Sequence, residues 1–327
     1  MFKKVIALGT LLVAICSTIE AQAQQSRVYS VGLVSLGSTV NEAVKGLRDG
    51  LKDAGYIEGK NLLLDVGIAK NYDGLRPIVQ AYIEKQFDII VSTGASAPLV
   101  AKKSTQHIPI VFIGGADPVQ AGLVKSMARP EGNITGIARY RDTEIYGKRL
   151  EVFKEAVPNL RRVTVLYNAR GENPTHFASL RLLQKIAPKL GVTITEKPIK
   201  MGSDVESALA GISRDTTDGL FPICATIFRD LHKNMAEMAG QKRVALFGCS
   251  PLAVTDYGAL LYYGADTYRL GQRGAWYVDR ILKGAKPQDL PVEAPSYFEM
   301  IINLKTAKQI GVAIPPNVLA RADKVVK

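Results

Sequence analysis

Histidine and cysteine are scarce in this sequence, with three residues of each type among 327. The spacing of His107, His176 and His232 matches no zinc-binding signature and no catalytic triad. We place all three in solvated helices or loops. The sequence therefore predicts no metal site and no catalytic histidine.

Nucleotide-binding glycine motifs are absent as well. Neither G-x-G-x-x-G nor a P-loop occurs, so we expect no cofactor. Two segments resemble the nucleophile elbow G-x-S-x-G only loosely, because Pro98 and Leu252 stand where its last glycine belongs. We predict no catalytic residues, and a hydrolase is the weakest alternative.

The sequence also lacks an apolar run long enough for a membrane anchor. The longest run, Val5 to Cys16, is too short to span a bilayer and follows two lysines. With small residues at Ala21 and Ala23, residues 1–23 are predicted to be a cleavable signal peptide that directs the protein to the periplasm. Ile15 is too bulky for the usual lipid-attachment signal at Cys16.

Only two cysteines remain once the predicted signal is removed. Cys224 and Cys249 each end an apolar run, DGLFPIC and VALFGC, so neighbouring strands could bring them together. A disulfide and a pair of buried free thiols are both open, because the sequence does not give their separation.

Basic residues exceed acidic ones by 42 to 30, for a formal net charge of +12. They are dispersed along the chain and are not grouped with aromatic residues as on a nucleic-acid-binding face. Dispersed positive charge and export both argue against nucleic acid as a partner. The charge favours attraction of small anions.

The first half of the mature chain alternates predicted strands and helices. Strands are expected at 27–38, 61–69, 88–93 and 108–119, and helices at 41–55, 75–85 and from Pro98 to His107. This alternation is typical of a parallel sheet covered by helices on both faces. In such sheets ligands bind beyond the carboxyl ends of the strands.

The second half repeats this plan without repeating the residues. Its strand 161–168 corresponds to the first strand of the chain, a helix follows at 178–190, and segments 133–140 and 256–266 are predicted to cross between the two units. We predict an α/β fold of two similar Rossmann-like lobes with parallel sheets and a cleft between them. Lobe 1 is expected to span 27–138 and about 262–292, and lobe 2 to span 139–261 and about 296–327.

A turn of small residues between Asp88 and Pro98 is the strongest candidate for a binding site. The run DIIV ends in Ser92, Thr93 and Gly94, and a helix is expected to start near Ser96. Because a helix N-terminus carries partial positive charge, this turn favours a carboxylate or phosphate. The alternative is that Ser96 only caps the helix.

Other candidate residues follow strands or occupy the predicted crossings. Asp117 could pair with an ammonium group or cap its own helix, and Tyr140 could stack on a ligand. Tyr262 and Tyr263 alternate along a strand, so at most one faces the cleft. The candidate ligand-binding residues are Ser35, Ser38, Thr39, Thr93, Gly94, Ala95, Ser96, Asp117, Tyr140, Tyr167, Asn168 and Asp256.

Three long segments, 108–136, 147–168 and 278–323, resemble the ABC-transporter substrate-binding proteins, whose known members bind amino acids and often aromatic ones. The resemblance covers nearly the whole mature chain. It implies a periplasmic-binding-protein type I fold and a monomeric receptor that passes a small-molecule ligand to a membrane permease without catalysis. A sensor of the same fold that docks on a receptor kinase is the alternative.

The second lobe departs from the pattern of that family. Asn168 is followed by Ala169 where an Asn-Pro-x-Asn-Pro motif is usual, and Cys224 stands where an aspartate often follows a proline. Asp256 best matches the acidic residue that the family places before a Gly-Gly-Leu turn. These departures leave the identity of the ligand open.

Overall fold

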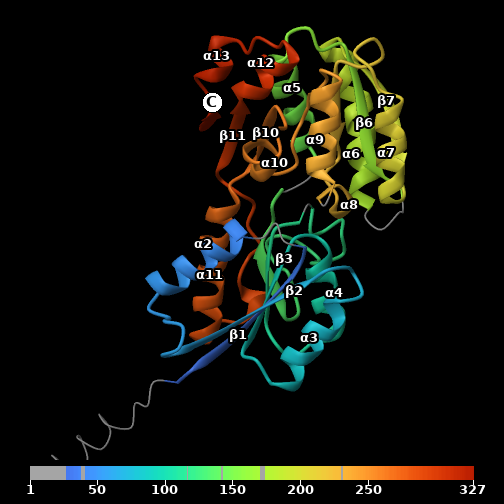
Figure 1. The fold of residues 1–327 in the computed structure, drawn as a ribbon. Coiled ribbons are helices and arrows are strands. Elements are labelled where there is room, and N and C mark those ends of the chain that lie inside the picture. The colour runs from blue at the N-terminus through green and yellow to red at the C-terminus, as the bar shows by residue number, and fades with distance from the viewer. Residues whose placement is uncertain (1–26, 38–40, 116, 141–142, 170–173, 230) are drawn as a thin grey trace, which may run out of the picture.

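The computed structural model describes residues 27–37, 41–115, 117–140, 143–169, 174–229 and 231–327. They form two α/β lobes, one above the other in Figure 1. Helices and strands alternate through most of the chain, as the sequence predicts. The predicted signal at 1–23 lies outside the described residues.

Lobe 1 is built on a five-stranded parallel sheet with the order β2-β1-β3-β4-β5. The central strands β3 and β4 are buried at every position, which explains their continuous apolar and small residues. The strands are β1 (Tyr29–Leu36), β2 (Leu62–Ala69), β3 (Ile89–Thr93), β4 (Ile110–Ile113) and β5 (Ile134–Ile137).

Helices cover both faces of this sheet. On one face α2 (Asn41–Asp53) packs against α11 (Thr267–Leu282), which returns from the C-terminal part of the chain (Figure 1). Their close contact requires glycine, since a Cβ at Gly271 would lie 2.1 Å from the carbonyl oxygen of Ala43. On the other face lie α3 (Leu75–Glu84) and α4 (Ser96–Ser104).

Lobe 2 repeats the arrangement with a parallel sheet of order β7-β6-β8-β9. The first four strands of lobe 1 follow the same order, so the internal repeat expected from the sequence is present. The elements of this lobe are α5 (Ile145–Ala156), β6 (Arg162–Asn168), α6 (Pro174–Ile186), η1 (Ala187–Leu190), β7 (Thr193–Ile199), α7 (Gly202–Ala210), β8 (Gly219–Pro222), α8 (Thr226–Arg229), α9 (His232–Gln241), β9 (Ala245–Leu246) and α10 (Pro251–Thr255).

A third, three-stranded sheet packs with lobe 2. Its strand β10 (Leu261–Ala265) runs antiparallel to β11 (Phe298–Asn303), which pairs in parallel with β12 (Lys324–Val326). A bridge from Phe247 to Leu261 connects β10 to the end of β9. The remaining elements are η2 (Pro287–Asp289), α12 (Leu304–Ile310) and α13 (Pro316–Leu319).

Three details differ from the expectations. The segment 133–140, expected as a crossing, contains β5, because residues 134–137 pair with β4 inside the sheet. The strand expected at 108–119 is only four residues long. His176 and His232, expected in solvated positions, are 8% and 4% exposed, because both helices that carry them pack on the lobe 2 sheet.

None of the described helices is both long and apolar enough to cross a membrane.

Candidate functional site

The turn after β3 is open at the start of α4. Gly94 has a φ of +79°, which reverses the chain between strand and helix. Ala95 occupies the N-cap position, and no side chain caps the helix. The alternative that Ser96 only caps α4 is therefore wrong, and no side chain of the described residues accepts from the first backbone N–H groups of the helix.

Thr93, which ends β3, is 5% exposed. Among the described residues, its Oγ1 atom has no hydrogen-bond partner, and neither has Oγ of the adjacent Ser92. A buried hydroxyl without a partner is unfavourable by about 1–3 kcal/mol, so such groups often belong to binding sites.

Two glycines at the end of β4 lie directly against this turn. Gly94 N donates to the carbonyl oxygen of Ile113 at 3.0 Å. A Cβ at Gly115 would lie 3.3 Å from the carbonyl oxygen of Gly94, and one at Gly114 would lie 3.4 Å from its nitrogen. A side chain at Gly114 or Gly115 would therefore press against the backbone of Gly94, and glycine at both positions leaves space beside the turn.

The crossing segment after β5 meets the same glycines. The carbonyl oxygen of Gly115 accepts from the backbone nitrogens of Arg139 at 2.8 Å and Tyr140 at 3.3 Å, and Asp117 N donates to the carbonyl oxygen of Tyr140 at 3.1 Å. The fold thus brings together the turn, Asp117 and Tyr140, as their places at strand ends predict.

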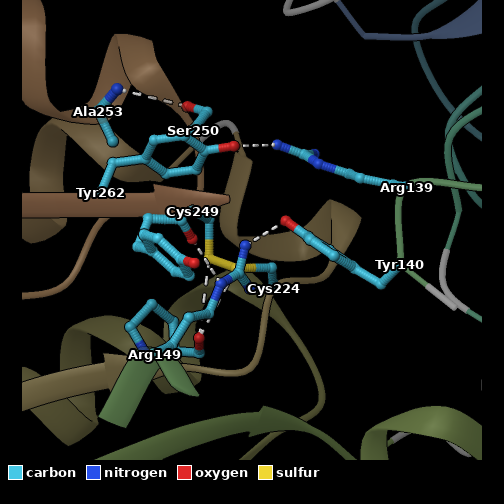
Figure 2. Close-up of a disulfide and its surroundings, with 10 residues drawn as sticks. Arg139, Tyr140, Arg149, Cys224, Cys249, Ser250, Ala253 and Tyr262 are labelled. Carbon is cyan, nitrogen blue, oxygen red and sulfur yellow. Dashed lines mark hydrogen bonds between the residues drawn. A yellow bond between two sulfur atoms is a disulfide. The ribbon is translucent and has the colours of Figure 1, made fainter. Parts of the chain in front are cut away.

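Tyr140 is 4% exposed and is held by Arg149 of α5, which is 1% exposed. Arg149 donates from Nη2 to the Tyr140 hydroxyl, from Nε to the carbonyl oxygen of Tyr263 at 2.8 Å, and from Nη1 to Cys224 Sγ at 3.4 Å. In Figure 2 its guanidinium lies beside the disulfide and points toward Tyr140. Arg149 therefore connects α5 to both crossing segments.

Arg139 reaches from the end of lobe 1 to lobe 2 (Figure 2). Its Nη2 donates to the hydroxyl of Tyr262 at 3.0 Å, and Tyr262 in turn donates to the carbonyl oxygen of Ala265 at 3.1 Å. Burial would lower the pKa of Arg139, but Tyr140 and Tyr262 raise it above its ordinary value. Burial also raises the pKa of Tyr262, which stays a neutral phenol.

Cys224 and Cys249 form a disulfide, with a Cα–Cα distance of 5.4 Å. This decides between the two states that the sequence left open. The bond joins the residues just beyond the ends of β8 and β9, on the side of the sheet where parallel strands present their carboxyl ends. His176 packs nearby, where burial lowers its pKa to about 4 although a hydrogen bond to the Cys224 backbone acts to raise it.

Two further candidates in lobe 1, Ser35 and Asp117, do not present a free side chain at the turn after β3. Ser35 is 1% exposed and lies within β1 instead of beyond its end. The Oδ1 atom of Asp117 accepts from Gln120 N at 2.9 Å, but residues 118–122 form a turn and not a helix, so Asp117 caps this turn and the helix-capping alternative is wrong. Ser38 and Thr39 lie outside the described residues.

The lobe 2 candidates are less closely grouped. The ring of Tyr167 packs edge to face on Phe177 at 6.0 Å, which fits a packing role. Asn168 is 7% exposed, and the pairing of Leu166 with Pro222 places it level with Cys224. Asp256 is exposed and contacts Thr255, and no hydrogen bond joins it to another described candidate.

Sequence reasoning missed Arg139 and Arg149, although one signal pointed to the second. Arg149 lies three residues after Tyr146 and four before Phe153 on α5, all at buried positions. An arginine on the apolar stripe of a helix is unusual and indicates a specific buried partner.

No group of side chains in the described part of the chain is arranged to hold a metal ion. A polar surface hollow of about 650 Å³, lined in part by Arg129, Glu131 and Asp289, lies near the start of β5. It is at the opposite end of the sheet from the turn and the crossing segments, so we do not assign the site there.

Two lobes of parallel α/β structure define a type I periplasmic-binding fold. The sequence matches the family model of the ABC transporter substrate binding proteins over residues 30–326. The chain belongs to this family.

Similar proteins agree with that assignment. A tyrosine-binding protein of Clostridioides difficile (strain R20291) is 27% identical over 273 residues, which cover 83% of this chain and 77% of that protein. A conserved domain protein of Vibrio cholerae is 30% identical, with a TM-score of 0.83 over 91% of this chain and 100% of its own. An ABC domain from Streptococcus pneumonia in complex with L-Trp shares the fold, at 22% identity and a TM-score of 0.81, over 91% of this chain and 100% of its own.

Proposed function

We propose that this protein is the extracytoplasmic solute-binding component of an ABC importer and that it binds an amino acid or related small carboxylate, aromatic ones included, in a cleft between the lobes. The observation that carries this proposal is the uncapped start of α4 beside Gly114 and Gly115. Free N–H groups and the helix dipole at this position favour a carboxylate.

The position of the turn supports the same ligand class. It lies at the carboxyl ends of β3 and β4, where open α/β sheets bind their ligands. The similar C. difficile protein is named for binding tyrosine, which is a carboxylate with an aromatic side chain. A ligand of this kind fits a turn that favours a carboxylate, beside the segment that carries Tyr140.

The proposed mechanism is closure of the lobes over the ligand, without a catalytic step or a cofactor. We place the lobe boundaries at 27–138 with about 262–292 and at 139–261 with about 296–327, and the first residues of the returning segment, 262–265, lie in β10 beside lobe 2. The ligand can shift the lobes only by the difference between its affinities for the closed and open states. We expect a periplasmic monomer whose closed form is recognised by a membrane permease.

A thermal-shift screen of amino acids, peptides and aromatic acids tests the ligand class. We expect at least one carboxylate to raise the Tm, and Ser96→Ala to reduce that shift. The control is Ser104→Ala at the far end of α4, where the hydroxyl only donates to the Val100 carbonyl at 2.9 Å. Absence of any shift with every carboxylate would contradict the proposal.

Affinity purification from detergent-solubilised membranes, with the ligand bound, tests the partner. We expect an ABC permease to copurify. Recovery of a receptor kinase without a permease would replace the importer assignment by the sensor alternative.

A further inference from the structure

Among the described residues, two guanidinium groups at the crossing between the lobes have no carboxylate partner. Within the described part of the chain, Arg149 donates only to neutral acceptors, namely the hydroxyl of Tyr140, the carbonyl of Tyr263 and the sulfur of Cys224. Arg139 contacts the hydroxyl of Tyr262 at 3.0 Å, and its Nε atom is buried without an acceptor. Every ion pair found among the described residues involves other side chains.

Neither charge can be removed by deprotonation, because arginine stays protonated in proteins. The tyrosines around them are not counter-ions either, since burial keeps Tyr262 and Tyr146 in the neutral phenol form. Removing an ion from water without a paired counter-ion is unfavourable by several kcal/mol. The site therefore carries a local excess of positive charge that an anion would balance.

The two arginines differ in what they can reach. Arg149 is 1% exposed and its guanidinium is enclosed by the rings of Tyr140, Tyr146 and Phe247, so it supports the crossing segment and does not meet a ligand. Arg139 is only partly buried, and among the described residues one of its five donors makes a side-chain hydrogen bond, to Tyr262. Arg139 is therefore the group available to a ligand.

The backbone of Arg139 also places it near the carboxylate turn. Its N–H binds the carbonyl oxygen of Gly115 at 2.8 Å, and Gly115 in turn lies against Gly94 and Ala95. The turn and the backbone of Arg139 thus both contact Gly115. The turn favours negative charge through its backbone N–H groups, and the Arg139 side chain favours it through a full charge.

The acidic groups near the described site are poorly suited to an ammonium group. Asp117 accepts from its own turn, and Asp256 is exposed beside Thr255. Glu299 interacts electrostatically with Arg139 but forms no ion pair with it among the described residues, and burial raises the pKa of Glu299 to about 7, so it is only partly ionised at neutral pH. The described part of the site thus offers full positive charges for an acid group and only the partial charge of Glu299 for an amine.

We propose that the ligand is a small carboxylate of net negative charge and that Arg139 binds its acid group. The site then prefers an aryl carboxylate without an α-ammonium group over the amino acid with the same side chain. This inference rests on the proposed function and narrows its ligand class.

Matched pairs of ligands that differ only in the ammonium group test the preference by isothermal titration calorimetry. The pairs are phenylalanine with 3-phenylpropionate, tyrosine with 3-(4-hydroxyphenyl)propionate, and tryptophan with indole-3-propionate. We expect the Kd of the deaminated acid to be at least about tenfold lower in at least one pair, a difference of 1.4 kcal/mol. The preference should shrink as the salt concentration rises.

The outcomes separate this inference from the proposed function. Equal or tighter binding of the amino acid in every pair that binds would overturn the inference and leave the carboxylate-binding function intact. If no carboxylate binds, in these pairs or in the wider screen, the proposed function fails and the inference fails with it.

Variants of Arg139 test the residue assignment. Arg139→Gln should weaken binding of the deaminated acid at least about tenfold, whereas Arg139→Lys should retain part of it because the charge remains. The control Arg129→Gln removes the same charge at an exposed position near the start of β5 and should leave the Kd unchanged. If Arg139→Gln unfolds cooperatively yet binds the acid with wild-type affinity, the assignment is wrong.

Discussion

The guanidinium of Arg149 lies 4.7 Å from the centre of the Tyr140 ring and donates a hydrogen bond to its hydroxyl. Arg149 belongs to α5 of lobe 2, whereas Tyr140 ends the segment that leaves β5 of lobe 1. A buried side chain of one lobe thus fixes the chain that enters it from the other. The same guanidinium holds the carbonyl of Tyr263 on β10, so both crossing segments share one donor.

This relationship predicts strong coupling between the two side chains. Tyr140→Phe should lower the free energy of unfolding by about 1–2 kcal/mol, because it leaves a buried charged donor without its acceptor. Arg149→Met should cost more, since Tyr263 also loses its donor. In urea denaturation the double variant should lose at least about 0.5 kcal/mol less than the sum of the single variants.

A second cycle provides the control for this coupling. Tyr56 donates to Asp279 in lobe 1, far from Arg149. Tyr56→Phe and Arg149→Met should therefore be additive. Additivity of Tyr140→Phe with Arg149→Met as well would mean that the contact between Arg149 and Tyr140 contributes nothing to folding.

Loss of the disulfide should destabilise lobe 2. The bond closes a loop between residues 25 positions apart, and the entropy of such a loop corresponds to about 3.5 kcal/mol. The Cys224→Ala, Cys249→Ala double variant should unfold at a lower urea concentration than the oxidised protein, and reducing agent should affect only the wild type. Titration of two free thiols in the native wild type would refute the bond.

Gly264 should not accept a side chain. A Cβ there would lie 2.5 Å from the hydroxyl oxygen of Tyr262 and 2.8 Å from that of Tyr140, so both buried rings would have to move. We expect Gly264→Ala to lower stability by about 1–3 kcal/mol in thermal or urea unfolding. At Gly211, with a φ of −78° and no atom within 4 Å of an added Cβ, alanine should be neutral or slightly stabilising. If Gly264→Ala and Gly211→Ala changed the stability equally, Gly264 would not lie as close to the hydroxyls of Tyr262 and Tyr140 as the structure shows.

Glu299 should make the protein less stable as the pH rises. Burial, with Asp266 and Asp323, raises its pKa from 4.5 to about 7, so the folded state binds this proton more tightly than the unfolded state. The stabilisation by the protonated form is complete below about pH 4.5 and is lost as the pH rises toward 7, by at most about 3 kcal/mol. Urea unfolding at a series of pH values should show this slope in the wild type and not in Glu299→Gln.

The comparison of wild type with Glu299→Gln is needed because His176 makes the protein more stable, not less stable, as the pH rises. Burial lowers its pKa to about 4, so its contribution is present above pH 6.5 and lost as the pH falls toward 4. The difference between wild type and Glu299→Gln cancels the His176 contribution. A flat difference between pH 4.5 and 7 would show that Glu299 has an ordinary pKa in the folded protein.

Much of the fold follows from local pattern. The buried run at Ile89–Thr93, the glycine after it and the helix from Ser96 were predictable, because burial periodicity and helix starts are encoded by neighbouring residues. Strand β5 was not, since its segment ITGI follows Gly132 and Asn133 and is stabilised by pairing with β4. Strand formation there depends on the neighbouring strand more than on intrinsic propensity.

The candidate site also contains residues that the sequence predicts and residues that it does not. The turn at Thr93–Ser96 and the place of Tyr140 followed from strand ends, which parallel topology brings to one edge. Arg139 gave no local signal, because its partner Tyr262 is 123 residues away in the sequence.

The sequence by itself determined the alternation of strands and helices, the internal repeat and the turn after β3, because each depends on residues close together in the chain. Only the tertiary structure decided the disulfide between Cys224 and Cys249, the contacts of Arg149 and the reach of Arg139 across the lobes. These contacts join distant segments, and their geometry is fixed only when the sheets and helices pack.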